Sequence, residues 1–305
     1  MTARSVSAAT DTDSGETAGL VLANFGRSAL VRSQGRTLHC ELHGRRLKLV
    51  CGDRVRWRKR AASAVIVEVL PRRNLLQRID SRGRCEPIAA DIDRLAVVLA
   101  PQPRPDWFVI DRYLAAAALI DIPAVLIQNK CDLAADELQA ELQVYRRLPL
   151  ICLTLSAKTS DTLGPLRAAI ATGATLLVGQ SGVGKSSLIN ALTPDGAAQT
   201  AALTRDAQGR HTTSTARWYQ LDARGALIDA PGVRDFAPPA GALRAAEHGF
   251  VEILATAAGC RFKDCRHFDE PGCAVRAAAR SGAIHPRRYE SYRRLARLYE
   301  SFQET

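Results

Sequence analysis

Several features that are common in other classes of protein are missing from this chain of 305 residues. No hydrophobic run reaches the roughly 20 residues that a membrane-spanning helix needs. The N-terminal stretch MTARSVSAATDTDSGETAGL lacks the apolar core of a secretory signal peptide. Internal repeats are also absent, which argues against a repeat architecture. We therefore expect a cytoplasmic protein that makes no contact with a membrane.

Acidic residues are too few to balance the basic ones. The chain has 42 Lys and Arg against 31 Asp and Glu, which gives a formal net charge of +11. The excess is concentrated in residues 26–60, where eleven Lys and Arg face only Glu41 and Asp53. This local surplus exceeds what solubility requires and indicates an anionic partner, such as a nucleic-acid backbone.

The apolar pattern divides the chain into a tail and three domains. Residues 1–18 are rich in Ser, Thr, Ala and Asp, and we expect a disordered tail. Residues 19–82 contain short alternating runs, typical of a small antiparallel barrel with the oligonucleotide-binding (OB) fold, although the arginines of a purely structural barrel would also keep it soluble. Residues 83–242 alternate strands with helices, which predicts a parallel sheet covered on both faces. Residues 243–305 hold a cysteine-rich loop and a basic amphipathic helix.

The stretch TLLVGQSGVGKSSLINAL predicts a phosphate-binding loop between a strand and a helix. Its glycines let consecutive backbone amides surround phosphates at the positive end of the helix. We expect Lys185 to reach the outer phosphates and the Ser186 hydroxyl to bind Mg²⁺. The expected nucleotide-binding residues of this loop are Gly179, Gln180, Ser181, Gly182, Val183, Gly184, Lys185, Ser186 and Ser187.

Two further motifs predict that the base is guanine. The motif NKCD places Asn129, Lys130 and Asp132 after the strand AVLIQ, at the end of a parallel sheet where ligands bind. The Asp132 carboxylate can accept hydrogen bonds from the ring N–H and the exocyclic amine of guanine, and adenine offers no such pair. The motif SAK, Ser156–Lys158, follows the next strand, and we expect the Ala157 amide to meet the guanine oxygen. Each motif alone is weak, but together with the phosphate loop they predict a GTP site.

The remaining parts of a GTPase follow the phosphate loop. Asp229 ends the strand ALID and is suited to hold Mg²⁺ through water, while the Gly232 amide is free for the γ-phosphate. Between the phosphate loop and this strand lies GRHTTS, Gly209–Ser214, in which Thr212 or Thr213 supplies a second hydroxyl to Mg²⁺, with Thr213 favoured. Because the base motifs precede the phosphate loop, the order predicts a circularly permuted GTPase in the α/β class. Its switch II loop then leads directly into the C-terminal domain.

A cysteine cluster predicts a metal centre in the C-terminal domain. Cys260, Cys265, His267 and Cys273 have the spacing C-x4-C-x-H-x5-C. Three thiolates and one imidazole fit a closed tetrahedral Zn²⁺ site, whose role is then structural. The alternative is a small core of reduced thiols, which leaves the crowding of these residues unexplained.

These three parts together resemble the RsgA (YjeQ) family of bacterial GTPases that depend on the small ribosomal subunit. The resemblance extends from residue 19 to about 300 and includes CGDRV, NKCD, GQSGVGKSSLIN, GRHTTS, DAPGVRDF and the zinc motif. It implies a GTP hydrolase that binds the small subunit late in assembly and checks the decoding region. We expect a monomer whose other partners are GTP or GDP and the 16S rRNA of the subunit. One departure is Asp91 in AADIDR, where family members usually have Asn, and we assign it no role.

The chain lacks the glutamine that orients the attacking water in Ras-like enzymes, because Val233 follows Gly232. Intrinsic turnover should then be slow, with the missing group supplied by switch I or by the ribosome. His211 is our candidate, since it adjoins the threonines expected on Mg²⁺ and an imidazole can accept a proton near neutral pH. Alternatively, His211 only packs switch I or touches RNA. The expected catalytic residues are His211, Lys185 and Thr213.

Two alternative functions remain open at this stage. One is an RNA-binding assembly scaffold that binds GTP with little hydrolysis, and the other is a metallochaperone GTPase that uses the cysteine cluster for transfer. A cluster with four ligands and no open position argues against the second. The basic helix PRRYESYRRLARLYE either adds an RNA contact or packs its tyrosines inward as a solvated helix.

Overall fold

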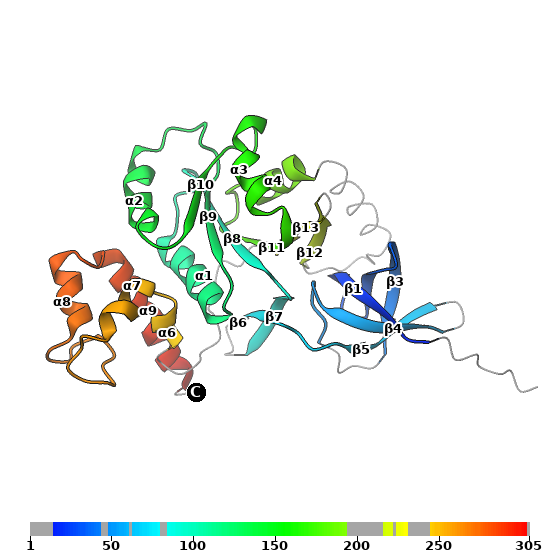
Figure 1. The fold of residues 1–305 in the computed structure, drawn as a ribbon, viewed down its shortest axis with the longest axis horizontal. Coiled ribbons are helices and arrows are strands. Elements are labelled where there is room, and N and C mark those ends of the chain that lie inside the picture. The colour runs from blue at the N-terminus through cyan, green and yellow to red at the C-terminus, as the bar shows by residue number, and fades with distance from the viewer. Residues whose placement is uncertain are drawn as a thin grey trace, which may run out of the picture.

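The computed structural model describes residues 15–43, 48–60, 63–79, 84–193, 216–221, 224–230 and 245–303. A barrel of N-terminal strands, a central α/β domain and a C-terminal group of helices follow one another across the molecule (Figure 1). Most of the predicted N-terminal tail lies outside the described residues, and the first strand begins at Thr17. None of the described helices is long and apolar enough to span a bilayer.

The barrel consists of five strands, which are β1 (Thr17–Asn24), β2 (Ser28–Ser33), β3 (Arg36–Leu42), β4 (Arg54–Arg60) and β5 (Ser63–Val69). They pair in the order β1-β2-β3-β5-β4, and β4 pairs back with β1, which closes the barrel. Alternate residues fill its interior, among them Val31, Val55 and Ile66, all fully buried. The predicted OB barrel is confirmed, with one pair, β3–β5, running parallel because β4 turns away from β3 to close against β1.

The central sheet explains the alternation of strands and helices in the sequence. Its strands are β8 (Arg94–Leu99), β9 (Ala124–Gln128), β10 (Ile151–Thr154), β11 (Thr172–Val178), β12 (Arg217–Gln220) and β13 (Arg224–Asp229). Their order is β10-β9-β8-β11-β13-β12, and all pairs are parallel except β12–β13. The strands of both base motifs precede β11, the strand of the phosphate loop, so the predicted circular permutation is confirmed.

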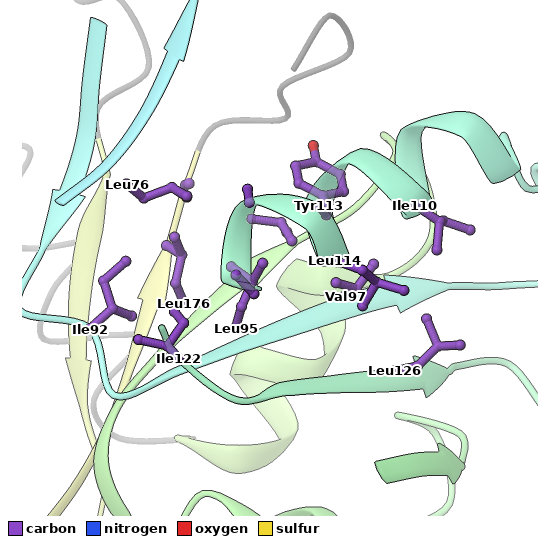
Figure 2. Close-up of a cluster of buried hydrophobic side chains, with 14 of the residues drawn as sticks. Leu76, Ile92, Leu95, Val97, Ile110, Tyr113, Leu114, Ile122, Leu126 and Leu176 are labelled. Carbon is purple, nitrogen blue, oxygen red and sulfur yellow. The ribbon is translucent and has the colours of Figure 1, made fainter. Parts of the chain in front are cut away.

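Helices cover both faces of this sheet. They are α1 (Trp107–Leu119) and α2 (Asp136–Arg146) on one face, and α3 (Gly164–Ala169) and α4 (Lys185–Leu192) on the other, with the short 3-10 helix η1 (Ser160–Thr162) before α3. Leu95 and Val97 of β8 enter the first core, whereas Ala96 and Val98 enter the second. Figure 2 shows the first core, where Leu95, Val97 and Leu126 of the strands pack against α1.

The barrel joins the central domain by two routes. The β6–β7 hairpin, β6 (Leu75–Ile79) and β7 (Cys85–Ala90), lies between them in the sequence and forms its own two-stranded sheet. Strand β1 also pairs with β12 at a single position, Ala23 with Arg217, so that the barrel and the central sheet form one continuous sheet.

The C-terminal domain is helical and packs on α1. It contains α6 (Ala245–His248), α7 (Val251–Ala257), α8 (Ala274–Ser281) and α9 (Pro286–Gln303). Phe250, Tyr292 and Leu295 are fully buried in a core that also includes Ala115 of α1. A Cβ atom at Gly249 would clash with Ala115, so the close approach of this domain to α1 requires a glycine.

Candidate nucleotide-binding site and metal centre

The predicted phosphate loop lies between β11 and α4, as its sequence indicates. Gly179, Gly182 and Gly184 have φ values of 143°, 84° and 97°, which residues other than glycine rarely adopt. A Cβ atom at Gly179 would also clash with the carbonyl oxygen of Val98 on β8. The backbone of this loop therefore depends on its glycines.

The first turn of α4 presents groups suited to phosphate. Ser186 and Ser187 are exposed there, and the first amides of a helix have no partner within it. Lys185, the first residue of α4, donates from Nζ to the carbonyl oxygens of Gly179 and Gln180, at 2.8 and 3.0 Å. The loop thus gathers free amides, two hydroxyls and one ammonium group at a helix N-terminus, which favours an anion.

Asp229 lies beside this loop at the end of β13, in register with Leu177 of β11. Burial raises the pKa of the Asp229 carboxyl, and the positive charge of Lys185 partly offsets that effect. Burial likewise lowers the pKa of Lys185, opposed by Asp229. A carboxylate and an ammonium group therefore share one partly buried site, and the exposed Ser186 follows Lys185 in the chain.

The two base motifs meet at Asp132. Ser156 donates from Oγ to Asp132 Oδ1 at 2.6 Å, and Lys158 Nζ lies 4.0 Å from Oδ2. The hydrogen bond from Ser156, aided by the positive charges of Lys158 and Lys130, holds the pKa of Asp132 below its usual range. The carboxyl is therefore ionised at neutral pH and acts only as an acceptor, which is the state that paired N–H donors of guanine need.

Asn129 and Lys130 connect the base motifs to the phosphate loop. Asn129 is almost fully buried, donates from Nδ2 to the Val183 carbonyl at 2.9 Å and accepts from the Ala157 amide at 3.0 Å. Lys130 donates from Nζ to the Gly182 carbonyl at 2.7 Å. Three motifs that are far apart in the sequence thus form one site. The Ala157 amide, which we expected to meet the guanine oxygen, here donates to Asn129.

A buried amide beneath the base motifs was not predicted from the sequence. Gln128, the last residue of β9, is 2% exposed, and its Oε1 accepts from Gln139 Nε2 of α2 at 2.8 Å and from Thr154 Oγ1 of β10 at 3.2 Å. The only signal for it in the sequence is a polar residue, Gln128, at the end of the apolar run AVLIQ, directly before NKCD. The partner on α2 follows from the three-dimensional packing alone.

Part of the predicted site lies outside the described residues. In switch I this part comprises His211, the candidate for water activation, and Thr213, the candidate for Mg²⁺ binding, with its alternative Thr212. In switch II it comprises Gly232 and Val233. Their roles stay predictions.

The cysteine cluster has the geometry of a metal site. The ligand atoms of Cys260, Cys265, His267 and Cys273 all lie within 4.8 Å of one another. Cys260 Sγ is 4.0 Å from Cys273 Sγ, and both are 3.5 Å from His267 Nδ1. Sulfur ligands about 2.3 Å from a tetrahedral zinc lie about 3.8 Å apart, so the four residues fit Zn²⁺.

A carboxylate also supports the histidine of this cluster. Glu247 Oε1 lies 3.5 Å from His267 Nε2, on the side of the ring opposite to the sulfur atoms. Such carboxylate–histidine contacts commonly fix the ring that binds a metal. Burial raises the pKa of the Cys265 and Cys273 thiols. Bound Zn²⁺ would supply the positive charge that stabilises their thiolates.

The basic helix α9 packs its aromatic residues inward. Tyr292 is fully buried, and its hydroxyl donates to the Arg266 carbonyl at 3.0 Å, while the Tyr289 hydroxyl donates to the His267 carbonyl. Arg287 and Arg288 point toward the central domain, where they pair with carboxylates. The inward tyrosines agree with the second of our two interpretations, but the first turn of α9 is not solvated, because Arg287 and Arg288 contact the central domain.

Comparisons with known proteins give one consistent result. The sequence profile of the RsgA GTPase family matches residues 69–238. The small ribosomal subunit biogenesis GTPase RsgA of Azotobacter vinelandii is 43% identical over 290 residues, which cover 91% of this chain and 84% of that protein. The RsgA protein of Pseudomonas aeruginosa PAO1 is 42% identical over 287 residues, covering 92% and 85% of the two chains.

Solved structures agree with this result. The crystal structure of YjeQ from Thermotoga maritima has a TM-score of 0.70 and 27% sequence identity, and covers 95% of this chain and 99% of that one. The circularly permuted GTPase YloQ has the same TM-score at 23% identity, over 96% and 98% of the two chains, and supports the fold alone. Together with the permuted order of motifs around one nucleotide site, these matches show that the chain belongs to the RsgA GTPase family and is a GTP hydrolase.

Proposed function

We propose that this GTPase binds the small ribosomal subunit, that the subunit stimulates its hydrolysis of GTP, and that it acts as a checkpoint late in subunit assembly. The observation that carries the proposal is the single site formed by Asp132, Asn129 and the phosphate loop. The names of the relatives, which are biogenesis GTPases of the small ribosomal subunit, support the choice of partner. The cytoplasm, where ribosomes are assembled, is the proposed location, and a monomer is the proposed state.

The geometry of the described part of the site supports the proposed nucleotide contacts. Asp132 accepts from the guanine N–H groups, and the first amides of α4 with Lys185 bind the phosphates. Ser186, Thr213 and, through water, Asp229 would hold Mg²⁺, which offsets negative charge on the γ-phosphate. Zn²⁺ bound by the cysteine cluster has a structural role.

The barrel is the proposed contact with 16S rRNA. Four arginines that alternate along β4 are exposed, namely Arg54, Arg56, Arg58 and Arg60. Residues two apart on a strand share one face, so these side chains form a basic row on the outer surface. A row of arginines binds a phosphate backbone without reading its sequence, and the binding should weaken as salt is added.

The decisive experiment compares GTP turnover with and without purified ribosomal subunits. We expect small subunits to accelerate hydrolysis and large subunits to leave it unchanged. A protein that binds small subunits but hydrolyses GTP at the same slow rate with them would be the alternative, an assembly scaffold that uses GTP only for stability.

Guanine selectivity should depend on Asp132. Asp132→Asn should weaken GTP binding and favour xanthosine triphosphate, because xanthine carries a carbonyl where guanine carries its amine and an amide can donate to it. We expect the ratio of the dissociation constants for GTP and xanthosine triphosphate to change by about 10-fold or more, since hydrogen bonds to charged groups are among the stronger ones. Competition binding with the two nucleotides measures it. Equal binding of ATP and GTP by the unmodified protein would overturn the assignment of the base site.

His211 is the proposed group that positions the attacking water. His211→Ala should keep GTP affinity and binding to small subunits, while stimulated turnover falls about 10²-fold or more. Single-turnover hydrolysis with saturating subunits measures this step. A native stimulated rate in the variant would leave the orientation of the water to the ribosome.

A further inference from the structure

A side chain of the C-terminal domain holds the helix that follows the first base motif. Arg287, in the first turn of α9, donates from Nε to Glu141 Oε2 at 2.9 Å and from NH1 to the Tyr145 hydroxyl at 3.0 Å. Both partners belong to α2. The Arg287 guanidinium also lies 4.6 Å from the centre of the Trp107 ring, which stacks on Tyr145. One arginine thus fixes α2 against α1 and α9.

The same helix α2 reaches the base motifs through Gln139. Gln139 lies two residues before Glu141 and donates from Nε2 to the buried Oε1 of Gln128. Gln128 directly precedes Asn129, the first residue of NKCD. The second donor to Gln128 Oε1 is Thr154, which ends the strand leading to Ser156. A single buried oxygen atom therefore ties α2 to the ends of both strands that carry the base motifs.

The strength of this tie comes from burial. If α2 moves away, Gln128 Oε1 loses its closer donor and keeps only Thr154 at 3.2 Å. Because water does not replace the lost donor at a buried oxygen, the arrangement with Gln139 in place is preferred. Recognition of guanine needs Asp132 within hydrogen-bond distance of two N–H groups at once. Small displacements of the loop that carries Asp132 would weaken that recognition more than binding of the phosphates.

We propose that Gln139 is a positioning residue for guanine recognition, and that Arg287 of the C-terminal domain holds α2 where Gln139 can act. The C-terminal domain then contributes to nucleotide selectivity without touching the nucleotide. The inference rests on the proposed function of Asp132 as the residue that recognises guanine.

The test compares GTP with inosine triphosphate, which lacks only the exocyclic amine. The ratio of their dissociation constants measures the hydrogen bond between that amine and Asp132, and we expect about 10-fold or more for the unmodified protein. Gln139→Ala and Arg287→Ala should each lower this ratio about threefold or more, because both let Asp132 move. A general loss of stability would weaken both nucleotides equally and leave the ratio unchanged.

Matched controls are available on the same helices. Gln143 is exposed one turn after Gln139 on α2 and makes no side-chain hydrogen bond within the described part of the chain, so Gln143→Ala should keep the ratio. Arg293 on α9 is 26% exposed, close to the 21% of Arg287, but pairs with Glu290 inside the C-terminal domain. Arg293→Ala should therefore also keep the native ratio. Gln139→Met, which conserves the length of the side chain, replaces Gln139→Ala if that variant does not fold.

The outcomes separate the inference from the function on which it rests. A native ratio in the Gln139 and Arg287 variants, with a reduced ratio in Asp132→Asn, would overturn the inference and leave the base site intact. A native ratio in Asp132→Asn would overturn both. A reduced ratio in the Gln139 variant alone would overturn the role of Arg287. Isothermal titration calorimetry of each variant, with its thermal unfolding recorded, gives all of these results.

Discussion

The GTPase domain is joined to its two neighbouring domains in different ways. The barrel contacts it through backbone pairs, Ala23 with Arg217 and Cys51 with Ala89 of β7, and through exposed groups such as Arg54, whose side chain is 52% exposed where it pairs with Asp91. The C-terminal domain contacts it through buried charges. Arg288 is 2% exposed and lies between Asp111 of α1, which is fully buried, and Glu252 of α7.

This difference in burial determines how much the ion pairs of each junction contribute to the free energy of unfolding. Exposed ion pairs contribute about 0–1 kcal/mol, because water competes for both partners. Breaking a buried pair costs about 3–5 kcal/mol, since it leaves a charge without either water or a partner. The C-terminal domain is therefore a thermodynamic part of the GTPase domain, whereas side-chain charges hold the barrel only weakly.

The largest effect should follow from loss of the metal ligands. Cys265→Ser should reduce bound zinc from about one ion per chain to nearly none, because a tetrahedral structural site needs all four ligands. The C-terminal core would loosen, and with it the contact of that core with Ala115 of α1, so the GTPase domain should also unfold at lower temperature. Elemental analysis and thermal unfolding measure the two effects.

The control for the metal site is a cysteine elsewhere in the chain. Cys85 is exposed on β7, far from the cluster in the sequence, and Cys85→Ser should keep both the zinc and the unfolding temperature. Full zinc content in Cys265→Ser would contradict the assignment of this cluster as the metal site.

The second largest effect should come from Arg288. Arg288→Met should lower the free energy of unfolding by about 3–5 kcal/mol, because the carboxylate of Asp111 would lose its closest charged partner, now 2.7 Å away. Denaturant unfolding measures the loss, and Arg293→Ala on the same helix is the control. A loss of less than about 1 kcal/mol would mean that the two junctions do not differ as their burial implies.

The sequence predicts those parts of the site whose chemistry is local. The phosphate loop, NKCD and the cysteine cluster are each short segments in which residue type and spacing are set by the ligand. The barrel follows from the alternation of apolar residues, the parallel sheet from the alternation of strands with helices, and the permutation from the order of the motifs. The parallel pairing of β3 with β5 does not, because alternation within a strand does not specify its neighbour.

Contacts between distant residues could not be predicted in the same way. Asp111 and Arg288 are 177 positions apart, and neither belongs to a motif. The sequence does not show whether the arginines of α9 contact RNA or protein, because a positive charge can pair with phosphates and with carboxylates alike. Only the packing of α9 on α1 and α2 decides between the two for Arg287 and Arg288.

The smallest effect should come from Asp91, the residue that departs from the family pattern. Its φ of 52° lies in the left-handed region, which Asp and Asn tolerate equally, and its Oδ1 accepts from the Arg73 amide at 2.6 Å. Asp91→Asn keeps this acceptor but loses the charge and the second oxygen, Oδ2, which accepts from Arg54 Nε at 3.0 Å. Because Arg54 is half exposed, the variant should lose less than about 1 kcal/mol in denaturant unfolding, and added salt should reduce the difference further. A loss as large as that of Arg288→Met would show that the barrel, too, is joined by charges that water does not reach.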